Sequence, residues 1–342
     1  MAVSANSTPI CKGVRRTLLN AAGTVTYTVR TESPNEVIFS GRATNRPGET
    51  SVAVELFDIL APHLRQTIPN IYGVYYDDMS SLEASDFARR FVLAYGNTTE
   101  NIDVRADYDE RGSLTAGYLD TNPIRLELPF GAPLVGSVHY CPAGSVQLRK
   151  GTTAIRTISN ASARAVNVAF DTCEDVQEGD TLSILWPSGT NGTSGARSGP
   201  AYKIAPQCGD AWVLYYVNIY GGLDQVWMKG ICRRTDSFER EQADVYRAMS
   251  ATGSPDRRVT RIDTAATWEL NTGILNDNQS RIFARNVPGT PAAFLLKLGT
   301  EPWGWPVTIE DTAVQYLSAA SNGRRPVNYT LTVKLAQDRV RL

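Results

Sequence analysis

The residues that could carry acid–base chemistry are poorly arranged for it. Asp77 and Asp78 are adjacent carboxylates in a tyrosine-rich segment, YGVYYDDMSS. A glycoside hydrolase needs two carboxylates on opposite sides of a cleft, which adjacency in sequence does not provide. A calcium loop needs oxygen ligands at alternate positions, where Met79 fits poorly. The pattern therefore predicts a solvated loop rather than an acid–base or metal site.

The cysteines and histidines show no spacing that is typical of a metal site. No CxxC pair is present, and five cysteines in a chain of this length indicate free, partly buried thiols. Spacing alone leaves a Cys141–Cys173 disulfide open. His63 and His139 share no motif, and the signatures of zinc proteases, nucleophile elbows, dinucleotide-binding folds and kinases are absent. The sequence thus predicts no catalytic residue, no cofactor and no metal.

Aromatic residues are better candidates for a binding function, because their rings combine a large contact area with a polar edge. They can form the cores of β-sandwiches, cover a partner subunit, or stack on sugars. Tyr72, Tyr75 and Tyr76 belong to this group. The candidate interface residues are Tyr215, Tyr216, Tyr220, Trp227, Trp303 and Trp305.

Four of these six residues lie in the stretch from Trp212 to Glu241, where β-forming residues flank a turn on both sides. Gly221 and Gly222 permit the positive φ that a tight reversal needs, so the stretch predicts a hairpin. Tyr215 and Tyr216 are consecutive and must point to opposite faces of a strand. Burying both of them requires cover on both faces, from another domain or another subunit.

Composition and charge exclude several classes of protein. The chain has 342 residues, 42% of them hydrophobic, which is enough for two or three domains. A formal net charge of -1 gives no overall attraction to nucleic acid or an anionic membrane. Basic doublets such as Arg233-Arg234 have acidic neighbours, so we expect no direct nucleic-acid site. No apolar run is long enough for a membrane span, and the N-terminus lacks the apolar segment of a signal peptide.

Short strands separated by turn residues predict a mainly β fold, with two or three antiparallel β-sandwich or barrel-like domains and a few short helices. We expect an N-terminal β-rich domain over residues 1–133 and a small β-sandwich domain over 134–190. A C-terminal β-rich domain with one short helix is expected over 201–342. The composition of residues 188–200, SGTNGTSGARSGP, predicts a flexible linker or loop.

Two elements near the C-terminus have clear local signals. Asn276 or Asp277 can cap a helix that continues through Asn286 and ends before Pro288. Apolar and polar residues alternate from Val327 to Leu335, which predicts a strand with one buried face.

A set of turn and strand segments is similar to those of a known class of proteins. The segments are Phe39–Ala43 (FSGRA), Leu214–Gly222 (LYYVNIYGG), Lys229-Gly230, Arg234–Asp236 (RTD), Leu270–Gly273 (LNTG) with Asp277 and Gln279, Pro306–Asp311 (PVTIED) and Val327–Arg339 (VNYTLTVKLAQDR). In these segments the chain resembles virion structural proteins of tailed bacteriophages, especially those of gut Bacteroides-type phages and prophages.

The resemblance implies a structural role, because proteins of this class are β-rich subunits that form rings in the tail, collar or baseplate. It implies a non-enzymatic subunit of a phage tail, connector or baseplate that assembles as a homo-oligomeric ring. Copies of itself and other virion proteins would be its partners. The protein would be made in the host bacterial cytoplasm and located in the virion. The alternative is a carbohydrate-binding module or adhesin whose exposed tyrosines and tryptophans stack on sugars.

Overall fold

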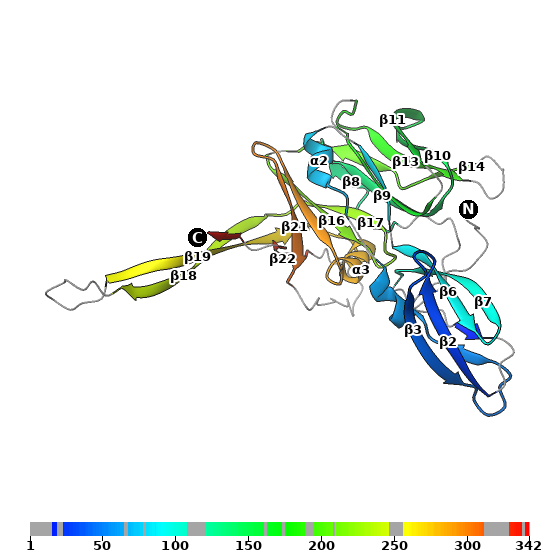
Figure 1. Cartoon of the computed structure of the whole chain (residues 1–342). Coiled ribbons are helices and arrows are strands. Elements are labelled where there is room, and N and C mark those ends of the chain that lie inside the picture. The colour runs from blue at the N-terminus through cyan, green and yellow to red at the C-terminus, as the bar shows by residue number, and fades with distance from the viewer. Residues whose placement is uncertain are drawn as a thin grey trace, which may run out of the picture.

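The structure is a computed structural model of a mainly β protein, shown in Figure 1. In the described part of the chain, the regular structure consists of several antiparallel sheets, three short α-helices and one 3-10 helix, so the predicted fold class is confirmed. None of the described helices is long and apolar enough to span a membrane. The described residues are 16–18, 23–64, 68–77, 80–85, 87–107, 121–160, 163–172, 175–188, 195–207, 209–245, 256–310, 328–336 and 339–341.

The N-terminal region is built on a four-stranded antiparallel sheet in the order β3-β2-β6-β7. Apolar side chains from one face of this sheet pack against a short ribbon, β1–β4, and against α1. Val29, Phe91 and Leu56 are fully buried in this core. The elements are β1 (Arg16–Leu18), β2 (Thr24–Thr31), β3 (Val37–Thr44), β4 (Val52–Val54), α1 (Phe57–Leu60), the 3-10 helix η1 (Ala61–His63), β6 (Ala88–Tyr95) and β7 (Thr98–Arg105).

Two further sheets face each other across one apolar core and form a β-sandwich. One has the order β5-β12-β9, and the other has the order β11-β10-β13-β15-β8, with β14 paired to β13. All neighbours are antiparallel except the parallel pair β15–β8. The strands are β5 (Ser81–Ala84), β8 (Glu127–Pro129), β9 (Leu134–Cys141), β10 (Gly144–Lys150), β11 (Thr153–Asn160), β12 (Ala163–Phe170), β13 (Thr181–Ser188), β14 (Gly195–Ser198) and β15 (Tyr202–Ala205).

The sandwich is wider than the stretch 134–190 in which the sequence placed it. Strands β5, β8 and β15 come from before and after that stretch, because the open edges of its sheets pair with segments from elsewhere in the chain. The predicted flexible loop at 188–200 differs as well. Gly195–Ser198 pairs with β13 as β14, whereas residues 189–194 lie outside the described residues.

The C-terminal region forms an eight-stranded sheet in the order β17-β16-β20-β21-β22-β19-β18, with β23 paired to β19. One face packs on α3, and the other packs on α2 and on residues of the sandwich. The elements are α2 (Ile71–Tyr76), β16 (Ala211–Val217), β17 (Leu223–Met228), β18 (Arg233–Val245), β19 (Asp256–Asn271), α3 (Asp277–Asn286), β20 (Ala293–Leu298), β21 (Trp303–Ile309), β22 (Thr330–Leu335) and β23 (Arg339–Arg341).

The two local predictions near the C-terminus are confirmed. Asn276 caps α3 by accepting a hydrogen bond from the Gln279 N–H, and the Gln279 side chain accepts from the Asn276 N–H, a reciprocal capping box. In β22, Leu331 and Val333 are buried on one face. Val327 lies outside the described residues.

The solvated loop predicted around Asp77 is wrong in part. Ile71–Tyr76 forms α2, whose first turn is capped by the Asn70 side chain accepting from the Gly73 N–H. The burial of Ile71 and Val74 against the central sheet explains the difference, since tertiary packing outweighs the poor helix propensity of a Tyr- and Gly-rich segment. Asp77 follows the helix directly, and Asp78 lies outside the described residues.

Candidate functional site

The predicted hairpin is strands β16 and β17, and it lies at the centre of the molecule. The two strands pair from Trp212 with Met228 to Val217 with Leu223. Tyr215 and Tyr216 are both completely buried, and they belong to the cores on opposite faces of the sheet. The prediction that both faces are covered is confirmed. The cover comes from this chain itself, however, so neither tyrosine is available to another subunit.

Hydrogen bonds from two other regions of the chain converge on this hairpin and its turn. Buried Arg105, at the end of β7, donates from Nε and Nη2 to the Tyr220 carbonyl, at 3.3 Å each. The Leu223 N–H donates to Ser137 Oγ of the sandwich at 2.8 Å. The Val135 N–H donates to Gln225 Oε1 at 3.1 Å. The turn therefore fixes the N-terminal region and the sandwich to the central sheet.

A buried carboxylate holds the turn from within. Asp224 Oδ2 accepts hydrogen bonds from the Asn218 side-chain amide at 2.7 Å and from the Asn122 N–H at 2.8 Å. Asn218 Oδ1 in turn accepts from the N–H groups of Tyr220 and Gly222. No sequence motif marks Asp224 as buried, because its partners are distant in the chain or lie within a turn.

Two buried tyrosines near Asp224 make the protein sensitive to alkali. Burial, and then the charge of Asp224, raises the pKa of Tyr202 and of Tyr216 well above the usual value. Because the folded-state pKa values are raised, this stabilisation is complete below about pH 10 and is lost as the pH rises above it. We expect the free energy of unfolding to fall there by about 1.4 kcal/mol per pH unit for each tyrosine.

Urea unfolding between neutral and strongly alkaline pH measures this dependence. Tyr216→Phe should lower the slope by about 1.4 kcal/mol per pH unit at little cost at neutral pH, since the Tyr216 hydroxyl has no hydrogen-bond partner within the described part of the chain. An unchanged slope in this variant would contradict the assignment.

Of the remaining candidate interface residues, Tyr220 and Trp227 are half-buried. Lys229 Nζ lies 4.5 Å from the centroid of the Trp227 ring, which is a cation–π contact. Lys229 also forms an ion pair with Glu127 of β8. Trp227 thus belongs to the contact between the central sheet and the sandwich rather than to a free aromatic surface.

Trp303 and Trp305 border a pocket of about 510 Å³ beside α2. The Trp303 ring packs against Trp212 and Trp268, at centroid distances of 5.2 and 5.1 Å. These rings lie on the α3 face of the sheet, and strand alternation places Trp305 on that same face. The tryptophans therefore do not form one sugar platform inside the pocket, although the Trp305 side chain is 40% exposed.

The α2 side supplies the aromatic wall of the pocket. Tyr72 stacks on Tyr76, with ring centroids 5.6 Å apart and an interplanar angle of 14°. A Cβ on Gly304 would lie only 2.7 Å from the Phe294 ring and 3.1 Å from Tyr72 Cβ. Gly304 thus allows α2 to pack closely on the sheet. Tyr76 is 66% exposed.

The longest exposed feature is the arm, which we define as strands β18 and β19. Figure 1 shows it projecting away from the rest of the molecule. Every side chain from Arg233 to Ala243 is exposed, and Phe238 is 60% exposed. Strand β18 ends the sheet and pairs, within the described residues, with β19 alone, whereas β22 and β23 cover the other edge of β19.

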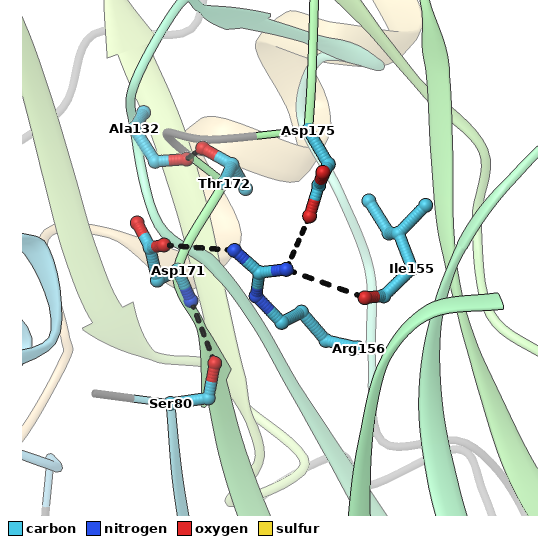
Figure 2. A network of polar contacts seen from close by, with 7 residues as sticks. All are labelled: Ser80, Ala132, Ile155, Arg156, Asp171, Thr172 and Asp175. Carbon is cyan, nitrogen blue, oxygen red and sulfur yellow. Dashed lines mark hydrogen bonds and ion pairs between the residues drawn. The ribbon is translucent and has the colours of Figure 1, made fainter. Parts of the chain in front are cut away.

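An ion-pair network inside the sandwich is structural. Figure 2 shows Arg156 of β11 between two carboxylates that follow β12, with Nη2 3.9 Å from Asp171 Oδ2 and Nη1 bonded to Asp175. The Asp171 N–H donates to Ser80 Oγ at 3.1 Å, and Thr172 Oγ1 donates to the Ala132 carbonyl at 3.0 Å. An arginine between the carboxylates ties the two sheets together and occupies the place that a cation would take.

The described residues contain no cluster of three or more metal-ligating side chains. Cys141 is a free, buried thiol that accepts a hydrogen bond from the Asn160 side chain, so the Cys141–Cys173 disulfide is not formed. Burial raises the pKa of Cys141 to about 12, which leaves it protonated and unreactive near neutral pH. Cys232 is free and half-buried. The other three cysteines lie outside the described residues.

Sequence comparisons with protein families and curated proteins give no relative. No protein-family model matches the chain, and a search of curated proteins finds nothing similar in sequence.

Proposed function

We propose that this chain is a non-enzymatic structural subunit of a phage tail, connector or baseplate that assembles with copies of itself into a ring. The observation that carries the proposal is the arm. Its edge strand β18 has 13 residues, and among the described residues only β19 pairs with it, which leaves one row of its backbone hydrogen-bonding groups open. Monomeric proteins usually shorten or cover such an edge. A ribbon exposed on both faces also gains little stability alone, so an assembly that covers it accounts for its length.

The oligomeric state of the full chain tests the proposal. Light scattering coupled to size-exclusion chromatography should give a multiple of the monomer mass, and negative-stain electron microscopy should show rings. Density for the chain in virions would place it in the particle. A monomer at micromolar concentration, without density in virions, would overturn the proposal.

Two shortened variants test the role of the arm. Ser237 and Ala265 are cross-strand partners, so an Asn-Gly turn can join them and remove the outer arm. The matched control joins Val245 to Asp256, also cross-strand partners, and leaves β18 intact. We expect the first variant to keep a β-sheet circular dichroism spectrum but to form a smaller assembly than the wild-type chain, and the control to assemble as the wild-type chain does. Assemblies of equal mass for both variants would show that the arm is dispensable.

Carbohydrate binding is the second candidate function, favoured by the pocket beside α2. Stacked Tyr72 and Tyr76 offer a ring face of the kind that sugars contact. A glycan array is the first test. If sugars bind in the pocket, Tyr72→Ala should abolish binding, whereas Trp305→Ala, on the opposite face of the sheet, should retain it. Loss in the Trp305 variant alone would place the sugar on that opposite face, and an array without hits would remove the candidate.

A further inference from the structure

The open edge of β18 has a charge sequence that is complementary to itself. From Arg233 to Glu241 it runs RRTDSFERE, and every one of these side chains is exposed. The pairing with β19 is regular over this segment, and an irregularity follows between Glu241 and Gln242. The regular segment is long enough to accept another antiparallel strand along its free edge.

We propose that β18 pairs antiparallel with β18 of a second copy, in the register that places Phe238 opposite Phe238 of the partner subunit. The proposal rests on the assembly function above and names the partner of the arm. In this register Asp236 lies opposite Arg240 of the partner subunit, and by symmetry Arg240 lies opposite the partner's Asp236. The central pair buries an aromatic ring that is 60% exposed in the single chain.

Charge selects this register among its neighbours, since like charges directly opposite each other destabilise a pair of strands. If the two-fold axis that relates the two strands passes through Asp236 or Glu239, that residue lies opposite its own copy, so two like charges face each other. An axis through Ser237 places Arg234 opposite Arg240 of the partner subunit, again two like charges.

A two-fold axis can also pass between two adjacent residues. An axis between residues 236 and 237 places Arg233 opposite Arg240, one between 237 and 238 places Asp236 opposite Glu239, and one between 238 and 239 places Asp236 opposite Glu241. Of the registers that pair seven or more residues of this segment, the one with its axis through Phe238 alone opposes no like charges, and it also forms two opposite-charge pairs. Other registers that avoid like charges, such as those with the axis through Thr235 or between Glu239 and Arg240, pair six or fewer residues of the segment.

The local contacts of β18 are compatible with this pairing. Arg234 Nε donates to Asp236 Oδ1 at 2.8 Å, on the face of the strand that also carries Phe238 and Arg240. Asp236 would thus lie between its own Arg234 and Arg240 of the partner subunit. A two-fold contact closes on itself, so it joins subunits in pairs, and a ring needs a separate heterologous contact.

Cysteine cross-linking tests the register. Phe238→Cys places two thiols directly opposite each other, at a separation that permits a disulfide. Oxidation should give a covalent dimer on non-reducing gels. In the control Thr235→Cys, at another exposed position of the same strand, the two thiols would lie about 20 Å apart. No dimer above the level of the oxidised wild-type chain should form. Equal cross-linking of both variants, or of neither, would overturn the register.

A charge exchange tests the same pairs without a covalent bond. Asp236→Arg or Arg240→Asp alone creates two like-charge pairs and should weaken pairing about tenfold or more in dissociation constant. The double variant D236R/R240D restores both pairs and should recover the wild-type value. A double variant no stronger than the singles would refute the proposal. If the wild-type chain forms rings while these tests fail, the pairing is wrong and the assembly function stands; a monomeric wild-type chain refutes the assembly function itself.

Discussion

Replacing Asp224 with alanine is expected to lower the free energy of unfolding by about 3 kcal/mol or more. The carboxylate is 1% exposed and accepts hydrogen bonds from Asn218 and from the Asn122 N–H. Alanine leaves both donors buried without these bonds, and Asn218 also orders the turn of the β16–β17 hairpin. Urea unfolding followed by circular dichroism measures the change.

Two further substitutions control for this prediction. Asp224→Asn keeps the size of the side chain and one acceptor oxygen, so it should cost less than alanine. Asp236→Ala removes an exposed carboxylate on the arm and should change the unfolding free energy of the single chain by about 0.5 kcal/mol or less. A loss below 1 kcal/mol for Asp224→Ala, on the order of the loss of one ordinary hydrogen bond, would show that the turn does not depend on Asp224.

Tyr215→Ala is expected to cost about 3–5 kcal/mol, the range for truncating a large buried aromatic residue. The ring is completely buried between the central sheet and the sandwich, and its hydroxyl donates to the Pro133 carbonyl at 3.0 Å. Tyr215→Phe keeps the ring and loses only the hydrogen bond, so about 1 kcal/mol is expected. Chemical denaturation of both variants separates packing from hydrogen bonding.

An exposed tyrosine provides the matched control. Tyr76→Ala, at a side chain 66% exposed, should change stability by about 0.5 kcal/mol or less. If Tyr215→Ala were as mild, the sandwich and the central sheet would not depend on each other for stability.

Elements with strong local signals were predictable from the sequence. The turn glycines and flanking β-forming residues of the β16–β17 hairpin, and the capping residues of α3, specify structure within a few residues. The consecutive tyrosines Tyr215 and Tyr216 also indicated correctly that both faces of their strand are covered. These predictions succeeded because the deciding interactions lie within one element or follow from strand geometry.

The remaining features depend on contacts between distant segments. Strands β5, β8 and β15 are short, and only pairing with remote strands identifies them as members of the sandwich. Helix α2 forms because Ile71 and Val74 are buried against a sheet that follows much later in the chain. In the candidate site, the sequence indicated Trp303 and Trp305 but could not show that α2 supplies the aromatic wall of the pocket.

The division of the sandwich among distant segments has a consequence for synthesis on the ribosome. Strand β8 emerges early, but its parallel partner β15 is translated only after the body of the sandwich. Strand β5 similarly waits for β12. Both must remain unpaired while the intervening chain is made, so the sandwich can close only late in translation. A nascent chain that stalls before Tyr202 would expose the edge of β13 that pairs with β15, a surface on which chaperones act.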